Sequence, residues 1–298
     1  MRGVKGLTLI ELLIALVISA ILIAGIYRTF VSQQKSYATQ EQVADMQQNV
    51  RVAINKMIRE IRMAGFGGKN ENTSGNNDII NVFGNVNGFA NIVNAVDNSP
   101  RPDNVGNSDE ITIVGAYTQI GTIGADVGAG STTLTVNYTG GPQFDKGYRK
   151  YMCINGRYNY EVVPAAGNPV TLAKTLTNPA GTLNEAHLAG EPVFLIRAIR
   201  YGLRVDANGV PVLFRDLYPN TVATQRDTVA EYVEDLQLRY VLVDTTEVDV
   251  PANPTDVRGV RITVQARTRM SDPDLKDGAG GFRRRTLTTY VDLRNLRD

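Results

Sequence analysis

Side chains that could do catalytic chemistry are scarce in this sequence. Its 298 residues include one histidine, His187, and one cysteine, Cys153. One histidine cannot build a multi-histidine metal site, and one cysteine cannot form an intrachain disulfide. Most nucleophile–histidine mechanisms would have to use His187, whose neighbours in NEAHLAGE supply no evident base. We therefore expect a protein that is not an enzyme, with His187 at a surface or turn position and Cys153 as a small buried apolar residue.

Two charged clusters near the C-terminus could bind ions. Asp272, Asp274 and Asp277 lie in the glycine-rich segment SDPDLKDGAGG and could bind Ca²⁺ through their oxygens, although their spacing is not that of an EF-hand. The basic run at residues 283–285 could contact DNA, but a solvated start of a strand is the simpler interpretation. Because the formal net charge is +1, we expect no nucleic-acid partner, and no motif indicates a cofactor.

A third candidate functional feature is a carboxylate inside an apolar segment. Residues 7–26 read LTLIELLIALVISAILIAGI, which as a helix would span about 30 Å, the thickness of a bilayer's hydrocarbon core. Glu11 lies well within this run. A carboxylate in hydrocarbon costs up to about 3 kcal/mol, so such residues usually have a partner and a function. The alternative is a tolerated charge that reaches towards the headgroups.

The residues before the apolar run set its orientation. Arg2 and Lys5 precede it without any acid, which places the N-terminus in the cytoplasm and residues 65–298 on the far side of the membrane. An ordinary secretory signal peptide is the alternative. Against it, the apolar run is too long, contains Glu11 and lacks a small-x-small cleavage site at its end.

The apolar run continues into a longer helix. No Pro or Gly interrupts residues 26–64, so residues 7–64 are predicted to form one helix of about 87 Å. Its second half carries an apolar stripe at helical spacing, which predicts packing against a globular core. The stripe consists of Val43, Met46, Val50, Ala53, Met57, Ile61 and Ala64. Gly65 is expected to cap the helix.

The rest of the chain favours strands. Residues 69–108 are rich in Asn and Gly and are predicted to be a long surface connection that can include short strands. From Asp109 the apolar period falls to two, and Asp206–Gly209 predicts a hairpin turn. The predicted strands include residues 111–114, 134–136, 151–154, 162–163, 192–204, 210–214, 236–242, 260–266 and 286–293. One long helix packed on antiparallel strands is an α+β fold.

The start of the sequence resembles the prepilin signature of type IV pilins and type II secretion pseudopilins. Lys5-Gly6 is followed by Leu7-Thr8-Leu9-Ile10-Glu11 and the long apolar run. The resemblance implies that a prepilin peptidase cuts between Gly6 and Leu7 on the cytoplasmic side and that Leu7 is N-methylated. It also implies an assembly role for Glu11, whose charge could meet the new amine of a neighbouring subunit.

Later segments are similar to PilW-type minor pilins, with the J-type pseudopilin of type II secretion as the nearest relative. The evidence is the order of several weak matches along the chain, including SDEITI at residues 108–113, VEDLQLRY at 233–240 and VRGVRI at 257–262. Arg28 stands where major pilins are expected to have a helix-kinking Pro, and there is no C-terminal Cys pair. Both departures favour a minor subunit.

These observations predict four segments and one function. The segments are a cleaved leader (1–6), a transmembrane and filament-core helix (7–26), its extension (27–64) and an extracytoplasmic strand-rich domain (65–298). The expected protein is a minor pilin that is inserted in the inner membrane and then enters a pilus or pseudopilus with other minor and major pilins. The alternatives are a J-type pseudopilin, an anchored extracytoplasmic binding or adhesion protein, and, less favoured by the scarcity of His and Cys, an anchored hydrolase.

Overall fold

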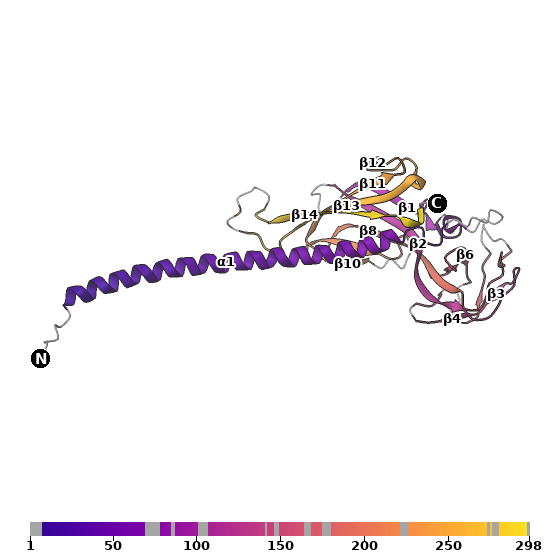
Figure 1. Ribbon diagram of the computed structural model, residues 1–298, viewed down its shortest axis with the longest axis horizontal. Helices are drawn as coiled ribbons and strands as arrows, with labels where there is room; N and C mark the ends of the chain where they lie inside the picture. The colour runs from indigo at the N-terminus through magenta and orange to yellow at the C-terminus, as the bar shows by residue number, and fades with distance from the viewer. Residues whose placement is uncertain are drawn as a thin grey trace. The chain divides into compact units, whose positions relative to one another are not determined.

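The computed structural model describes residues 8–68, 78–84, 87–100, 107–140, 142–145, 149–163, 168–174, 180–220, 226–272, 275 and 280–296 (Figure 1). The chain divides into two compact units. One comprises the residues up to Gln48 together with Thr268–Arg283, and the other comprises Asn49–Arg267 together with Arg284 onward.

The N-terminal helix α1 runs without interruption from Leu9 to Arg62, which confirms the predicted continuous helix. It ends as expected at glycine. Gly65 and Gly67 take positive φ angles of 77° and 86°, which favour glycine and turn the chain away from the helix axis. Phe66 between them packs its ring against the edge of Phe194, with centroids 5.1 Å apart.

The second half of α1 packs on the strand-rich domain. Val50, Ala53, Met57 and Ile61 are each at most 1% exposed, whereas Val52 on the opposite side is 60% exposed. The predicted stripe is therefore confirmed from Met46 to Ala64, and Val43 is half-buried. Helical periodicity predicted this face because burying it stabilises the helix on the domain.

Fourteen strands follow within the described ranges. They are β1 (Val93–Pro100), β2 (Asn107–Ile123), β3 (Thr133–Leu134), β4 (Val136–Tyr138), β5 (Tyr151–Ile154), β6 (Tyr158–Glu161), β7 (Val170–Thr171), β8 (Pro192–Val205), β9 (Pro211–Asp216), β10 (Arg226–Glu231), β11 (Val233–Leu242), β12 (Glu247–Val248), β13 (Val257–Arg267) and β14 (Arg284–Asp292). Short helical turns occupy Ile80–Gly84, Pro254–Asp256 and Arg294–Leu296. Every strand pairing is antiparallel among these residues, which confirms the α+β prediction.

The larger sheet is organised by the two long strands β2 and β8. They pair from Ile111↔Tyr201 to Thr122↔Pro192, with shifts in register near Tyr117 and Ile120. On one side of these bulges, β2 pairs with β1, and β8 pairs with β9, which in turn pairs with β10. On the other side, β2 pairs with β4 and β8 pairs with β5. There the two long strands continue into a lobe formed by the described residues between 118 and 195. The lobe has its own core, which includes Ile120, Phe144, Tyr160 and Leu195.

The smaller sheet has the strand order β12-β11-β13-β14 in the described part of the chain. One face buries Leu236, Leu238 and Tyr240 of β11 and the alternate apolar residues of β13, as their period of two predicted. Among the described residues three hydrogen bonds join this sheet to β2, one of them from Gln237 Nε2 to the Asn107 carbonyl at 3.5 Å. Ser108 Oγ donates to the Leu236 carbonyl at 3.1 Å, and the Leu238 N–H donates to Asp109 Oδ2 at 2.6 Å.

The connection that precedes β2 differs from the prediction. Residues 69–108 were expected at the surface, but Ile79, Val82, Phe83 and Phe89 are buried against β2, β5 and β8. The strand β1 in the same segment agrees with the expectation that the connection can include short strands. Ile79, Ile80, Val82 and Phe83 fall within five residues between Asn- and Gly-rich segments, a run too short to establish a period that would predict burial. By contrast, the β8–β9 hairpin is confirmed, with Asp206 accepting N–H bonds from Asn208 and Val210. The predicted strand at 162–163 is an isolated bridge between Val162 and Leu172.

Candidate assembly site

The N-terminus of α1 is closed by a reciprocal pair of side chains. The Thr8 N–H and Oγ1 both donate to Glu11 Oε2 at 2.9 Å, and the Glu11 N–H donates to Thr8 Oγ1 at 3.4 Å. This is a capping box, in which an N-cap Thr and a Glu three residues later satisfy each other's backbone donors. Thr8 is a site residue that our interpretation of the sequence missed, and the spacing Thr-x-x-Glu could have indicated it.

The capping box leaves Glu11 open to a second contact. Both Thr8 donors use Oε2. Among the described residues no donor is within hydrogen-bond distance of Oε1, and the side chain is exposed. Gly6 and Leu7, where cleavage and methylation are predicted, lie outside the described residues. The geometry therefore orients the Glu11 carboxylate without using up its capacity to accept.

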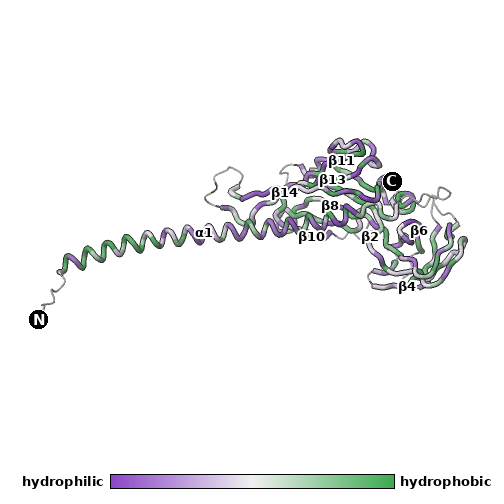
Figure 2. The backbone as a smooth tube through the Cα atoms, in the orientation of Figure 1, coloured by the Kyte–Doolittle hydropathy of each residue, from purple (hydrophilic) through white to green (hydrophobic). Residues whose placement is uncertain are grey.

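The apolar residues that follow Glu11 are exposed around the helix. An 18-residue window of α1 reaches a mean hydropathy of 2.8 with none of it buried, so α1 is long and apolar enough to cross a membrane. Figure 2 shows this hydrophobic stretch along the first half of α1. Exposed apolar surface of this extent requires a nonaqueous environment, such as lipid or other apolar helices.

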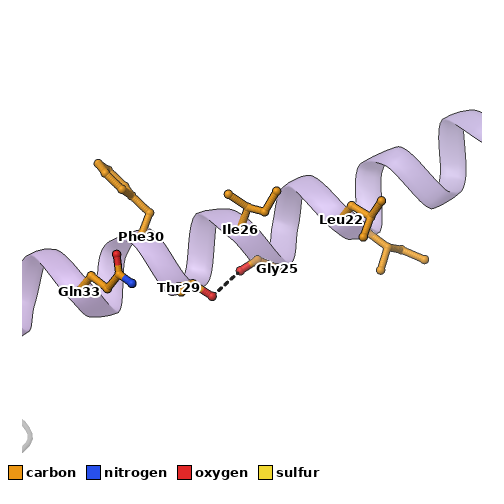
Figure 3. Close-up of a pocket in the computed structure, with 7 residues that line it drawn as sticks. Leu22, Gly25, Ile26, Thr29, Phe30 and Gln33 are labelled. Atoms are coloured by element: carbon orange, nitrogen blue, oxygen red, sulfur yellow. Dashed lines mark hydrogen bonds between the residues drawn. The ribbon is translucent and has the colours of Figure 1, made fainter.

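A shallow groove runs along one side of α1 at the end of this stretch. Figure 3 shows its side chains on successive turns, with the Thr29 hydroxyl donating to the Gly25 carbonyl at 3.1 Å. A Cβ placed on Gly25 would meet nothing within 4 Å, so this glycine is not required by packing inside the chain. A small residue followed four places later by Thr lets a second helix approach closely. The groove is lined by Ile21, Leu22, Gly25, Ile26, Thr29, Phe30 and Gln33.

At its other end, α1 is fixed to the larger sheet by a buried ion pair. Arg215 donates to both carboxylate oxygens of Glu60, at 2.8 and 2.5 Å, and the Tyr201 hydroxyl donates to Glu60 Oε2 at 2.6 Å. Burial first, and the Glu60 charge second, raise the pKa of Tyr201, so the phenol remains a donor. Burial is the largest influence on the pKa of Arg215 and lowers it, but the hydrogen bond to Glu60 and the charges of Glu60, Tyr201 and Asp227 together raise this pKa above its usual value. Glu60 was not recognised in the sequence because its partners lie more than 140 residues away.

His187 is not at the surface, and that prediction is wrong. The residue is 1% exposed. Its Nδ1 lies 2.8 Å from Glu191 Oε2 and its Nε2 lies 3.3 Å from the Tyr160 hydroxyl. Its backbone pairs with Val127, which draws it into the lobe. Burial raises the pKa of Tyr160 to about 12, so its hydroxyl stays protonated beside the His187 ring. The prediction that NEAHLAGE supplies no base beside His187 is also wrong, because Glu191 is the last residue of that segment.

Cys153 is buried as predicted. Burial raises the pKa of its thiol to about 12, which keeps it protonated and unreactive. A Cβ added at Gly67 would lie 2.9 Å from the Cys153 sulfur, so the turn after α1 packs closely on β5. Asn159 Nδ2 donates to the Gly67 carbonyl at 2.6 Å and holds the same turn on β6.

The predicted calcium segment is described only in part. Asp272 accepts from Arg283 at 2.9 and 2.7 Å, so its carboxylate already has a cationic partner. Asp274 and Asp277 lie outside the described residues, and calcium binding stays a prediction. In the basic run, Arg284 begins β14 as expected, but it is paired with Glu234 at 2.6 Å. Across the described ranges, no three His, Cys, Asp or Glu side chains are grouped to hold a metal.

One comparison with known proteins bears on these residues. The family model described as a prokaryotic N-terminal methylation motif matches residues 1–27. The match includes Gly6, Leu7, Thr8 and Glu11 and ends inside the groove of α1. The chain matches no curated protein and no solved structure. It therefore carries the N-terminal motif of type IV pilin-like proteins, which fits a membrane-anchored prepilin-peptidase substrate that assembles with other pilins.

Proposed function

We propose that this chain is a minor pilin of a type IV pilus, cleaved after Gly6, methylated at Leu7 and incorporated into a small complex at the filament tip that initiates assembly. One observation carries the proposal. The methylation motif at residues 1–27 coincides with a helix whose apolar side chains are exposed and whose second half is fixed to a strand-rich domain. Such a helix can anchor the subunit in a membrane and later pack among the helices of a filament.

The assembly step follows from the charge on Glu11. Cleavage after Gly6 creates an α-amine about one helical turn from Glu11, and the capping box with Thr8 holds the carboxylate at the start of the helix. When two helices meet in an apolar environment, the carboxylate of one subunit can pair with the amine of its neighbour. Each charge then recovers much of its desolvation cost, and the pairing sets the axial register of the two helices.

The lobe formed by residues 118–195 supports a position at the tip. Asn159 and Cys153 hold it against the turn at Gly67, so the lobe lies past the C-terminal end of α1 (Figure 1). In a filament built on parallel core helices, material past that end occupies the space of the next subunit. Arg28 within an unbroken α1 also supports a minor role, because major pilins are expected to kink there.

Substitutions at Glu11 and Thr8 separate the charge of Glu11 from the role of Glu11 in the capping box. Glu11→Ala removes both, Glu11→Gln keeps an oxygen for the Thr8 donors but loses the charge, and Thr8→Ala removes the cap at about 1 kcal/mol of helix stability. We expect all three to be inserted and cleaved. Thr8→Ala should enter filaments, while both Glu11 variants should be excluded, as measured by immunoblot of sheared filaments and membranes.

Three outcomes would change the proposal. Normal filament entry by Glu11→Gln would show that charge pairing is not what recruits the subunit. If deletion of the protein abolished secretion of folded substrates and left pili intact, the J-type pseudopilin would be the correct function. An anchored binding or adhesion protein would be indicated by a chain that is never cleaved.

A further inference from the structure

Two aspartates lie next to each other where β1, β2 and β11 meet. Asp109 of β2 is 3% exposed, and its carboxylate accepts the Asn98 N–H at 3.1 Å and the Leu238 N–H at 2.6 Å. The side chain of Asp97, on β1, is exposed and reaches hydrogen-bond contact with the Asp109 carboxyl. Two carboxylates this close repel each other unless a proton or a cation lies between them. The pair is therefore most stable with a positive charge beside it.

A bulge in β1 brings Asp97 to this position. The register of β1 on β2 shifts between Val96 and Ser99, so Asp97 and Asn98 both lie opposite Asp109. Asn98 takes a positive φ of 53°, a left-handed conformation that Asn adopts more readily than most residues. Bulges often redirect a side chain next to a functional site. Here the inserted residues bring both a carboxyl group and a backbone N–H to Asp109.

A buried phenol beside the two carboxyl groups has no hydrogen-bond partner among the described residues. Tyr240 of β11 is 1% exposed, and its hydroxyl is left unbonded. Burial first, and then the charges of Asp109 and Asp97, raise the pKa of Tyr240, so the hydroxyl stays protonated within electrostatic range of both carboxylates. Because a buried tyrosine hydroxyl normally has a partner, this oxygen indicates that a further group binds beside the aspartates.

No side chain in the described part of the chain neutralises the aspartate pair. None of the ion pairs found there includes Asp97 or Asp109. Burial is the largest influence on the pKa of Asp109 and raises it, the two backbone N–H bonds lower it, and the Asp97 carboxyl raises it again. The net effect is a raised pKa, so the fold loses stability as rising pH ionises Asp109. A cation from solution would remove this penalty.

We propose that Asp97, Asp109 and the Tyr240 hydroxyl bind one Ca²⁺ ion at the junction of the two sheets. All three ligands are oxygens, which suit a hard cation, and Ca²⁺ accepts irregular geometry and completes its coordination with water. Mg²⁺ requires a nearly ideal octahedron, and Zn²⁺ is bound mainly by nitrogen and sulfur. Since Asp97 is exposed, the ion can enter from solvent. With two carboxylates we expect a weak site, in the range of about 10⁻⁴–10⁻³ M that extracellular modules show.

The proposed site goes beyond the minor-pilin function and does not depend on processing at Gly6. The Asp109 carboxylate already joins β1 and β11 through its two N–H bonds. An ion bound here adds a link from the β1 bulge to Tyr240 of the smaller sheet, so it would hold the two sheets together. The site is also separate from the predicted calcium segment at residues 272–277, which follows β13 in the sequence.

Terbium luminescence of the full-length protein in detergent tests the site. Tb³⁺ occupies calcium sites and luminesces when a nearby aromatic ring is excited, and the chain has no tryptophan, so tyrosine must sensitise the ion. We expect a signal that Ca²⁺ displaces, binding weakened at least about ten-fold in Asp97→Asn, and loss of most of the signal in Tyr240→Phe. Asp277→Asn is the matched control, because it removes a carboxylate from the other calcium candidate and should leave the signal unchanged.

Unfolding midpoints give a second measurement. Asp97 is exposed, so Asp97→Asn should fold, and without Ca²⁺ at neutral pH its midpoint should equal or exceed that of wild type because the repulsion is gone. About 10 mM CaCl₂ should raise the midpoint of wild type but not of Asp97→Asn. The proposal is overturned if Ca²⁺ changes neither the terbium signal nor the midpoint of wild type, or if Asp97→Asn responds as wild type does. Stability that falls with rising pH but ignores Ca²⁺ would likewise overturn it, since a proton alone would then join the carboxyl groups.

Discussion

At the scale of single residues, two glutamates on α1 show how environment assigns a role to the same side chain. Glu11 is exposed in the apolar half of the helix, where its intrachain partner is Thr8. Glu60 is half-buried against the larger sheet, where the guanidinium of Arg215 and the phenol of Tyr201 donate hydrogen bonds to it. Glu60 therefore holds the domain on the helix, whereas the Glu11 carboxylate keeps one oxygen that accepts from no donor among the described residues.

The Glu60 contacts predict a large effect on stability. Side chains of Arg215 and Glu60 are 9% and 15% exposed, so Glu60→Ala leaves a nearly buried guanidinium without its partner. We expect a loss of about 3–5 kcal/mol in the free energy of unfolding. Replacing both residues by Met should cost less than Glu60→Ala, because no charge is then stranded.

Denaturant unfolding of the full-length protein in detergent measures the free energy of unfolding of both variants. The near-UV signal of tyrosine reports the transition, because the sequence contains no tryptophan. Tyr201→Phe is the matched control, since it removes one hydrogen bond to a charged group and should cost about 2 kcal/mol. Equal stability of Glu60→Ala and wild type would show that the ion pair does not fix α1 to the domain.

The sequence predicted residues whose signal is local and missed those whose partners are distant. Glu11 was recognisable because a carboxylate in an apolar run is costly anywhere in a membrane. Thr8 is an exception, because it was missed although its spacing to Glu11 is a local signal. His187 was not, because its burial depends on the bridge to Val127 and on Tyr160, which a local pattern does not reveal.

At the scale of elements, periodicity and helix breakers explain the successes. The helix was predictable because residues 26–64 contain no Gly or Pro and their apolar residues repeat at helical spacing. Strands β11 and β13 were predictable because they bury alternate residues. Strand β1, VNAVDNSP, was not, because it is largely polar and its bulge breaks the period of two.

The groove on α1 yields a prediction for the helix as an assembly element. Gly25→Leu fills space that nothing in the chain occupies and should raise intrinsic helix stability by about 1 kcal/mol. If a second helix approaches at Gly25, the variant should nevertheless enter filaments several-fold less than wild type. The ratio of subunit in sheared filaments to subunit in membranes measures this, with Ala24→Leu, outside the groove, as the control. Equal entry of both variants would show that the groove is not a helix contact.

At the scale of the whole molecule, the fold class could be predicted but the sheet topology could not. A long helix followed by alternating strands indicates α+β, whatever the pairing. The lobe of residues 118–195 depends on pairing β2 with β8 across about 70 residues and on two bulges. Long-range pairing of this kind leaves no mark in a local window, so the position of the lobe past the end of α1 came from the structure.

N-terminal processing distinguishes a pilin-like subunit from other anchored proteins, and mass spectrometry of the native protein's N-terminus detects it. We expect a mature chain that begins with N-methylated Leu7 and retains the apolar half of α1. A chain that still carries residues 1–6, or one that has lost the apolar segment, would contradict this expectation.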